Sequence, residues 1–227
     1  MYSLCSDENM LTLTAVNEVK KARSAAQSSE IVWTVLELDW FSKNSYNLAI
    51  KNLSIWSPRH SLRVLICCIA FIDQFPKDID EAASNDLWLR KMFCEFSAAT
   101  ALVALARGED VIETQLQDYL SLRKHVESFD GLLQDRLDGL DESPRRDLLQ
   151  KLAVLLGFDF EAACQLKAWD GLGEVILKTA CCNEPRVYEL MADCMLSSQA
   201  PTQGMYPVSN ILHIFLRVLT LPHSSSN

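Results

Sequence analysis

Large apolar residues recur at spacings of three and four along most of the chain, which is the pattern of helices that bury one side. The clearest run lies between residues 113 and 137, where an apolar stripe faces a side with charged residues such as Lys124 and Glu127. The stripe consists of Leu116, Tyr119, Leu122, Val126, Phe129, Leu133 and Leu137. We expect one long helix here, with the stripe in the core and the charged side in solvent.

The segment from Ile31 to Ile55 has a different pattern, because its apolar residues fall on more than one side of a helix. One side holds Trp33, Leu36, Trp40, Ile50 and Leu53, interrupted by Lys43 and Asn47, and Phe41, Leu48 and Ala49 lie elsewhere. A helix that is apolar all round is usually enclosed by its neighbours. We therefore expect this helix to be wedged between others, as one member of a stacked array.

Capping patterns indicate where several helices begin. Ser57-Pro58 and Ser143-Pro144 each join a capping hydroxyl to a proline at the first helical position, where the missing N–H costs nothing. Asp110, three residues before Glu113, resembles the start of a capping box. Gly157 suits a C-terminal cap for the helix that starts at Ser143-Pro144.

The remaining patterns complete an all-α chain. A helix from Glu81 or Asn85 to Ala106 should bury a face made of Leu89, Phe93, Phe96, Thr100 and Val103. Further helices are expected at 10–27, 58–75, 159–167, 170–181 and 208–219, and from Glu184-Pro185 onward. About nine helices result, arranged in hairpins at intervals typical of helical-repeat proteins. No tetratricopeptide consensus can be matched residue by residue, so the spacing predicts a degenerate α-solenoid of helical hairpins, and a plain helical bundle stays open as the alternative.

This interpretation divides the chain into three parts. Residues 1–29 form a poorly ordered N-terminus that holds a weak helical pattern, residues 30–220 form a single α-helical repeat domain, and residues 221–227 form a disordered tail. A repeat segment without its neighbours leaves apolar surface uncovered at its broken end. We therefore expect an apolar patch around Ile31–Trp40.

Composition and charge narrow the functional class. The 227-residue chain has a net charge of −9 and a pI near 4.9, so it repels phosphates and we expect no direct binding to nucleic acid. The eight cysteines show no CxxC spacing and several lie in helical patterns, which indicates reduced, packed thiols. No signal peptide or membrane-spanning run is visible, so we expect an intracellular, soluble protein with no membrane partner.

Sequence motifs with known chemistry are missing. The chain contains no GxSxG, P-loop or HExxH motif, and its histidines, at 60, 125, 213 and 223, are not spaced with carboxylates as metal ligands would be. We therefore predict no catalytic residue, no cofactor, no metal site and no small-molecule substrate. An all-α enzyme whose site gathers around His60, His125 or a cysteine stays open as an alternative.

Two groups of residues are candidates for protein recognition. Trp40, Tyr46 and Asn47 lie in the first long helix, where asparagine is a poor helix former. Trp169 and Asp170 lie at a junction between two short helices, where an aromatic residue can anchor an interface. The alternative for both groups is packing, with an interhelix amide hydrogen bond in the first and a filled helix corner in the second.

A family resemblance adds to these patterns. The stretch LDWFSKNSYNLA, residues 38–49, resembles an aromatic and asparagine-containing helix of the meiotic Spo-twenty-two/Zip-four family, whose animal relative is testis-expressed protein eleven. Residues 156–170 and 187–193 are similar to the C-terminal part of the fungal branch. The similarity extends over residues 30 to 200, and these stretches are packing patterns.

The resemblance implies a tetratricopeptide-like α-solenoid that acts as a non-enzymatic scaffold on meiotic chromosomes in the nucleus. Its implied role is protein–protein interaction in meiotic recombination, supporting crossover formation and synaptonemal complex assembly, with other meiotic chromosome proteins as partners. Family members are several times longer, so this chain would correspond to a C-terminal portion. A general helical-repeat adaptor unrelated to meiosis stays open as the alternative.

Overall fold

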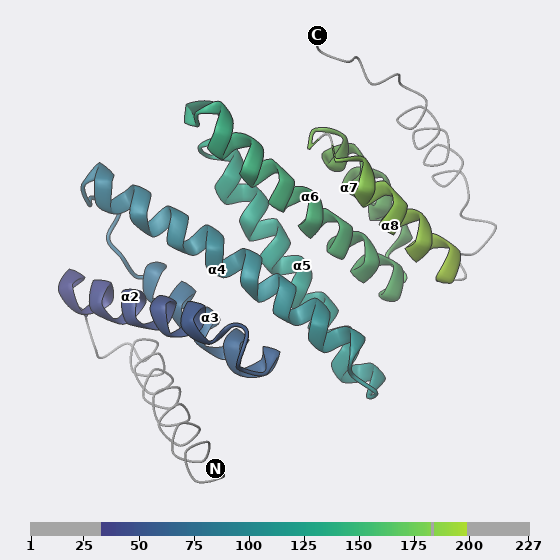
Figure 1. Ribbon diagram of the computed structural model, residues 1–227, viewed down its shortest axis with the longest axis horizontal. Coiled ribbons are helices and arrows are strands. Elements are labelled where there is room, and N and C mark those ends of the chain that lie inside the picture. The colour runs from purple at the N-terminus through teal and green to yellow at the C-terminus, as the bar shows by residue number, and fades with distance from the viewer. Residues whose placement is uncertain (1–32, 183, 199–227) are drawn as a thin grey trace. The chain divides into compact units, whose positions relative to one another are not determined.

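The computed structural model describes residues 33–182 and 184–198, and this part of the chain is all-α (Figure 1). It contains seven α-helices and two short 3₁₀ segments. The α-helices are α2 (Val35–Asn52), α3 (Pro58–Ile72), α4 (Glu81–Arg107), α5 (Ile112–Gln134), α6 (Glu142–Gln165), α7 (Leu172–Ala180) and α8 (Pro185–Ser197), and the 3₁₀ segments are η1 (Leu137–Gly139) and η2 (Trp169–Gly171). The predicted helices at 10–27 and 208–219, and the tails at 1–29 and 221–227, lie outside the described residues.

The all-α prediction is confirmed, and successive helices pack against each other as a helical-repeat fold requires. The chain forms two compact units, residues 1–105 and 106–227, with the boundary inside α4. Each unit is described by itself below. The single repeat domain over residues 30–220 stays a prediction.

In the first unit, α2 and α3 form an antiparallel hairpin. Leu38, near the start of α2, packs with Cys67 and Phe71 near the end of α3, whereas Ala49 near the end of α2 packs with Val64. The predicted start of α3 is confirmed, with Ser57 at the N-cap and proline at the first position. The Ser57 hydroxyl, however, bonds His60 Nδ1 at 2.8 Å instead of capping a backbone amide.

α2 is buried on one side only, opposite to the side that holds Leu36, Trp40 and Ile50. Its buried residues are Leu38, Ser42, Ser45 and Ala49. The predicted enclosure of this helix on all sides is therefore wrong. Small side chains face inward because they let the axes of neighbouring helices approach closely, and the larger residues are left on the other side.

α4 packs against the α2–α3 hairpin through a face that the sequence did not indicate. Leu87, Cys94 and Ala98 of α4 belong to the same apolar cluster as Ala49 and Val64. In the predicted core face, Val103 is buried, but Leu89 is 56% exposed and Thr100 is also exposed. The face was predicted from the largest side chains, whereas burial follows the positions that fit against the hairpin.

In the second unit, α5 and α6 form the next hairpin. The predicted buried stripe of α5 is confirmed from Tyr119 to Leu133, but the helix ends at Gln134 and Leu137 lies in η1. The buried residues of α5 are Tyr119, Leu122, Val126, Phe129 and Leu133. The predicted caps are wrong for both helices. Val111 is the N-cap of α5, in place of Asp110, and Asp141 is the N-cap of α6, in place of Ser143.

The predicted end of α6 at Gly157 is wrong, because the helix continues to Gln165 and absorbs the short helix expected at 159–167. A Cβ at residue 157 would lie 3.0 Å from Leu190 Cδ2 and 3.2 Å from Val187 Cγ1, both in α8. Glycine is therefore needed inside the helix for the close approach of α8. The need for glycine at residue 157 comes from α8, which is distant in sequence, so no pattern near residue 157 indicates it.

The actual end of α6 is a Schellman motif. Lys167 has a positive φ of 57°, its N–H donates to Cys164 O at 3.1 Å, and Ala168 N–H donates to Ala163 O at 2.8 Å. The left-handed position usually holds glycine, which lacks the Cβ that makes this conformation costly. Because this position holds lysine, the sequence lacks the glycine that would have indicated the end of the helix.

The last two described helices both pack on α6. α7 buries Leu172, Val175, Ile176 and Thr179, and α8 buries Val187, Tyr188 and Met191. The predicted start of α8 is confirmed, because Pro185 occupies its first position. α6 is therefore the helix around which the second unit is packed.

Candidate functional site

The side of α2 that faces away from the packed helices carries a row of apolar residues. Leu36 is 82% exposed, Trp40 is 60% exposed and Ile50 is 40% exposed. Lys43 and Asn47 are exposed between them. These five positions follow the helical repeat, so they form one stripe, which we call the outward side of α2. The apolar patch expected around Ile31–Trp40 is present at Leu36 and Trp40, and Ile31 lies outside the described residues.

The inward side of α2 is held by polar contacts as well as by packing. Arg90 of α4 is 5% exposed, and its Nη1 donates to Ser42 Oγ at 2.8 Å. The same guanidinium pairs with Asp86 and lies 4.0 Å from Asp39. Cys68 Sγ donates to the carbonyl oxygen of Ser42 at 3.3 Å. A buried cation requires such partners, so these contacts fix which side of α2 points inward.

The structure divides the first group of predicted recognition residues. Trp40 and Asn47 lie on the outward side, whereas Tyr46 is half-buried with its ring 5.2 Å from that of Phe93 in an edge-to-face contact. Burial raises the pKa of the Tyr46 hydroxyl. Asn44 bonds within its own helix, to Trp40 O at 2.7 Å, so the interhelix amide bond expected for this group is not formed by that residue. Tyr46 is a packing residue, and Trp40 and Asn47 are available to a partner.

The second predicted group lies at the turn after α6. Trp169 is half-buried and Asp170 is exposed, both in η2. This segment follows the Schellman motif at Lys167 directly. The two groups belong to different units, and each is a separate candidate.

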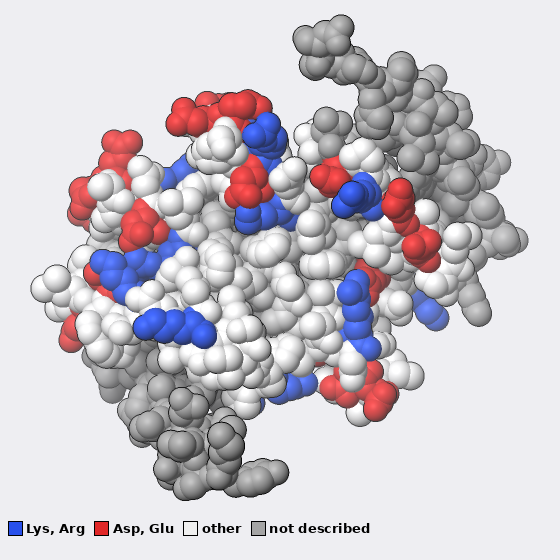
Figure 2. Space-filling view, in the orientation of Figure 1, with Lys and Arg blue, Asp and Glu red and all other residues white. Residues whose placement is uncertain are grey.

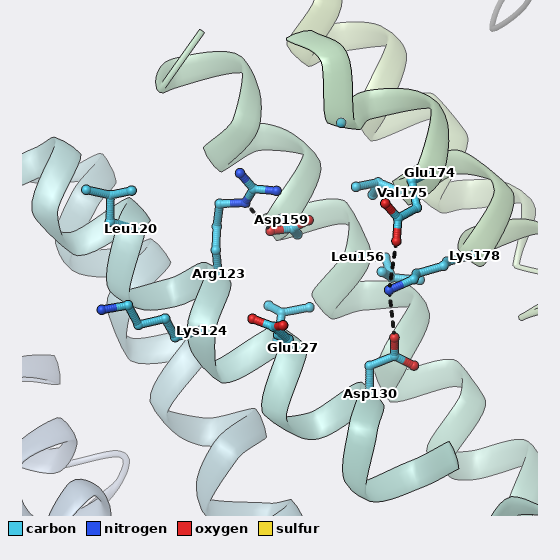
Figure 3. A pocket seen from close by; sticks show the side chains of 12 residues that line it. Leu120, Arg123, Lys124, Glu127, Asp130, Leu156, Asp159, Glu174, Val175 and Lys178 are labelled. Atoms are coloured by element: carbon cyan, nitrogen blue, oxygen red, sulfur yellow. Dashed lines mark hydrogen bonds and ion pairs between the residues drawn. The ribbon is translucent and has the colours of Figure 1, made fainter. Parts of the chain in front are cut away.

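A cavity of about 460 Å³ lies in the second unit between α5, α6, η2 and α7 (Figure 3). Leu120, Val126, Leu156 and Val175 form its apolar wall. Its charged lining consists of Arg123, Lys124, Glu127, Asp130, Asp159, Glu174 and Lys178. The sequence placed Lys124 and Glu127 on a solvated side of α5, and only the packing of α7 against α6 turns that edge into the wall of a cavity.

Ion pairs cross this cavity. Arg123 Nε donates to Asp159 Oδ1 at 2.7 Å, and Lys178 Nζ lies 3.1 Å from Asp130 Oδ2 and 3.4 Å from Glu174 Oε1 (Figure 3). Burial raises the pKa of the Asp159 carboxyl, and the hydrogen bond from Arg123 opposes that shift. Most charges in the cavity are therefore balanced by a neighbour within the unit.

A second buried carboxylate in this unit is structural. Glu161 accepts hydrogen bonds from Arg107 Nε at 3.0 Å and from Tyr119 Oη at 2.9 Å. Arg107 also lies over the ring of Phe158, 5.6 Å from its centroid. Burial and the neighbouring carboxylate of Glu161 raise the pKa of Tyr119. These contacts tie the end of α4 to α5 and α6, and they occupy both oxygens of the carboxylate.

Three cysteines of the second unit have thiols that are hard to ionise. Burial raises the pKa of Cys194 to about 11 and the pKa values of Cys164 and Cys182 to about 12. A nucleophilic cysteine needs the opposite shift, because the thiolate is the reactive form. His60 and His125 do not line the cavity described above.

Within residues 33–182 and 184–198, no three His, Cys, Asp or Glu side chains gather as metal ligands would. None of the helices in these segments has the length and apolar character needed to cross a bilayer. On the face in Figure 2, Lys and Arg side chains occur in small groups among Asp and Glu.

Comparison of the chain with protein-family models, with curated proteins and with solved structures finds no match.

Proposed function

We propose that this protein is a non-enzymatic helical-repeat scaffold that binds partner proteins through the outward side of α2. The observation that carries the proposal is the exposure of Leu36 and Trp40 on the side of α2 opposite to its packed residues. Large exposed apolar side chains in a contiguous row are typical of protein-interaction sites. Tryptophan is also among the residues that contribute most to interface energy.

The shape of the outward side favours one kind of partner, an α-helix with an apolar stripe of its own. Leu36 and Ile50 are fourteen residues apart, which corresponds to about 21 Å along the axis. Side chains in a row on one helix pack into the groove between rows of another. Lys43 lies within the stripe and pairs with Asp39 at 2.7 Å, and this ion pair can meet polar residues of such a partner.

The absence of a catalytic role is part of the proposal and is supported by the state of the reactive groups. The thiols with resolved shifts have raised pKa values, which disfavours thiolate chemistry. Glu161 is engaged by Arg107 and Tyr119. The all-α enzyme alternative needs a free nucleophile or base, and neither these thiols nor Glu161 is one.

The biological setting that we propose is meiotic recombination, with a role in crossover formation and synaptonemal complex assembly on chromosomes in the nucleus. The support for this setting is the resemblance of residues 38–49, 156–170 and 187–193 to the meiotic Spo-twenty-two/Zip-four family. Trp40 and Asn47 belong to the first of these stretches and lie on the outward side. The expected partners are other meiotic chromosome proteins.

Affinity capture with the full chain from meiotic and vegetative cells tests this function. Wild-type protein should recover identified crossover or synaptonemal complex proteins from meiotic cells only. Trp40→Ala should weaken that recovery by about 30-fold or more, the effect of losing a hot spot of about 2 kcal/mol. Leu177→Ala is the matched control, because Leu177 is also an exposed apolar residue but lies in the second unit.

The outcomes separate the two parts of the proposal. Equal recovery by the Trp40→Ala variant would exclude the outward side of α2 as the binding surface. Recovery of the same partners from vegetative cells would instead favour a general helical-repeat adaptor. Circular dichroism of each variant shows whether the fold is retained, which is expected because Trp40 is exposed.

A further inference from the structure

The cavity between α5, α6 and α7 has no part in the function proposed above. The residues that line it select one kind of ligand. It combines an apolar wall with charged groups of both signs. Its volume of about 460 Å³ is within the usual range of ligand-binding sites, about 300–1,000 Å³. It lies wholly within the second unit, so its geometry does not depend on the first unit.

The charges of the cavity leave one carboxylate without a cation. Arg123 is paired with Asp159, and Lys178 is shared by Asp130 and Glu174. Among the described residues, Glu127 has neither a hydrogen-bond nor an ion-pair partner. Figure 3 shows its carboxylate below the Arg123–Asp159 pair and to the left of Lys178, while Lys124 extends away in the other direction.

The unbalanced charge acts inside the cavity. Burial is the largest influence that raises the pKa of Asp159, and the negative charge of Glu127 adds a smaller influence in the same direction. The lining has four carboxylates against three cations, so an anionic ligand would meet net repulsion. A cationic group beside Glu127 would balance the excess negative charge of the lining.

The apolar wall adds a second requirement for the ligand. Leu120, Leu156 and Val175 line the same cavity as Glu127. Lysine and arginine side chains have the matching form, because methylene groups that pack on apolar surface carry a charged end. The net charge of −9 would also steer a basic partner toward this protein.

We propose that this cavity binds a lysine or arginine side chain from a basic segment of a partner protein. The charged end pairs with Glu127, and the methylene groups pack on Leu120, Leu156 and Val175. This site is distinct from the outward side of α2. A partner could engage either surface without the other.

Binding of a fluorescently labelled hexalysine peptide to the full chain, measured by anisotropy at low salt, tests the proposal. Glu127→Gln should weaken binding by about 10-fold, the effect of losing one charge-assisted hydrogen bond of about 1.5 kcal/mol. Glu113→Gln is the matched control, because Glu113 is an exposed glutamate on the same helix and its removal changes the net charge equally. It should leave the affinity within about 2-fold, because Glu113 does not line the cavity.

Several outcomes would overturn the site. Equal losses in the two glutamate variants would show that hexalysine responds only to bulk charge. Tighter binding of labelled hexaglutamate than of hexalysine would show that the cavity takes anions. If spermine binds more tightly than hexalysine and loses affinity in Glu127→Gln, the ligand is a free polyamine and the partner-segment assignment fails.

The result is also separable from the function proposed for α2. Trp40→Ala should leave hexalysine binding unchanged, and Glu127→Gln should leave the capture of meiotic partners through α2 unchanged. Glu127 is exposed and has no partner to lose among the described residues, so its replacement should preserve the fold, which circular dichroism checks.

Discussion

The contacts that hold α2 in the first unit differ in kind from those that hold α5 in the second. α2 meets its neighbours through Leu38 and the small residues Ser42, Ser45 and Ala49, with the buried guanidinium of Arg90 bonded to Ser42. α5 meets α6 through large side chains such as Phe129 and Leu133. The first arrangement leaves large apolar residues outside, and the second uses them as its core.

This difference teaches how a helix in such a fold can be both a structural element and a binding surface. A helix that packs through small residues and polar anchors does not need its large apolar side chains for stability. Those side chains can then remain exposed for a partner, as Leu36 and Trp40 are. A helix such as α5 buries its large residues in the core, and its charged residues such as Glu127 lie at its edge.

The largest expected effect compares the two helices directly. Phe129→Ala should lower the free energy of unfolding by about 3–5 kcal/mol, because it opens a cavity in a fully packed core. Leu36→Ala should change it by no more than about 0.5 kcal/mol, because that side chain is exposed. Urea unfolding followed by circular dichroism measures both. Similar losses in the two variants would mean that the outward side of α2 belongs to a core, and the comparison would fail.

A smaller effect tests whether tertiary packing decides which glycines of the second unit can be replaced by a larger residue. Gly157→Leu should destabilise the protein by about 1–3 kcal/mol, because the new side chain must displace Leu190 and Val187 of α8. Gly131→Leu should stabilise it by up to about 1 kcal/mol, because nothing lies near that position and leucine favours helix. Thermal and urea unfolding report the sign of each change. A stabilising Gly157→Leu would show that α8 does not approach α6 as described.

The smallest effect concerns the end of α6. Lys167→Gly should stabilise the protein by about 0.5–1 kcal/mol, because glycine adopts the left-handed conformation without a Cβ penalty. The same change inside α6, Lys151→Gly, should instead destabilise it by about 1 kcal/mol. Urea midpoints of the two variants should therefore move in opposite directions. Movement in the same direction would argue against the Schellman motif at this position.

Parts of the fold could be predicted because their causes are local. The stripe of α5 was predicted correctly because large residues on one side and charges on the other have a single sensible orientation. The starts of α3 and α8 were predicted from Pro58 and Pro185, since proline at the first helical position acts through its own ring. The same reasoning failed at Asp110 and Ser143, where a neighbouring residue takes the N-cap.

The candidate sites were predicted only in part. Trp40 and Asn47 were recognised as unusual residues, but their exposure depended on the choice of Ser42 and Ser45 as the packed side. Tyr46 was grouped with them by proximity in sequence, yet it packs against Phe93. The cavity at Glu127 had no pattern of its own, because its wall comes from three separate helices and the η2 turn.

The sequence by itself determined that the described part of the chain is helical, where α3 and α8 begin, and which side of α5 is buried, because these depend on side chains a few residues apart. Tertiary structure decided which side of α2 faces the core, why Gly157 lies inside a helix, and where Glu127 meets Lys178 and Asp159 in one cavity. Those outcomes depend on how closely helices distant in sequence can approach. That closeness is set by the shapes of both partners together, and neither helix specifies it alone.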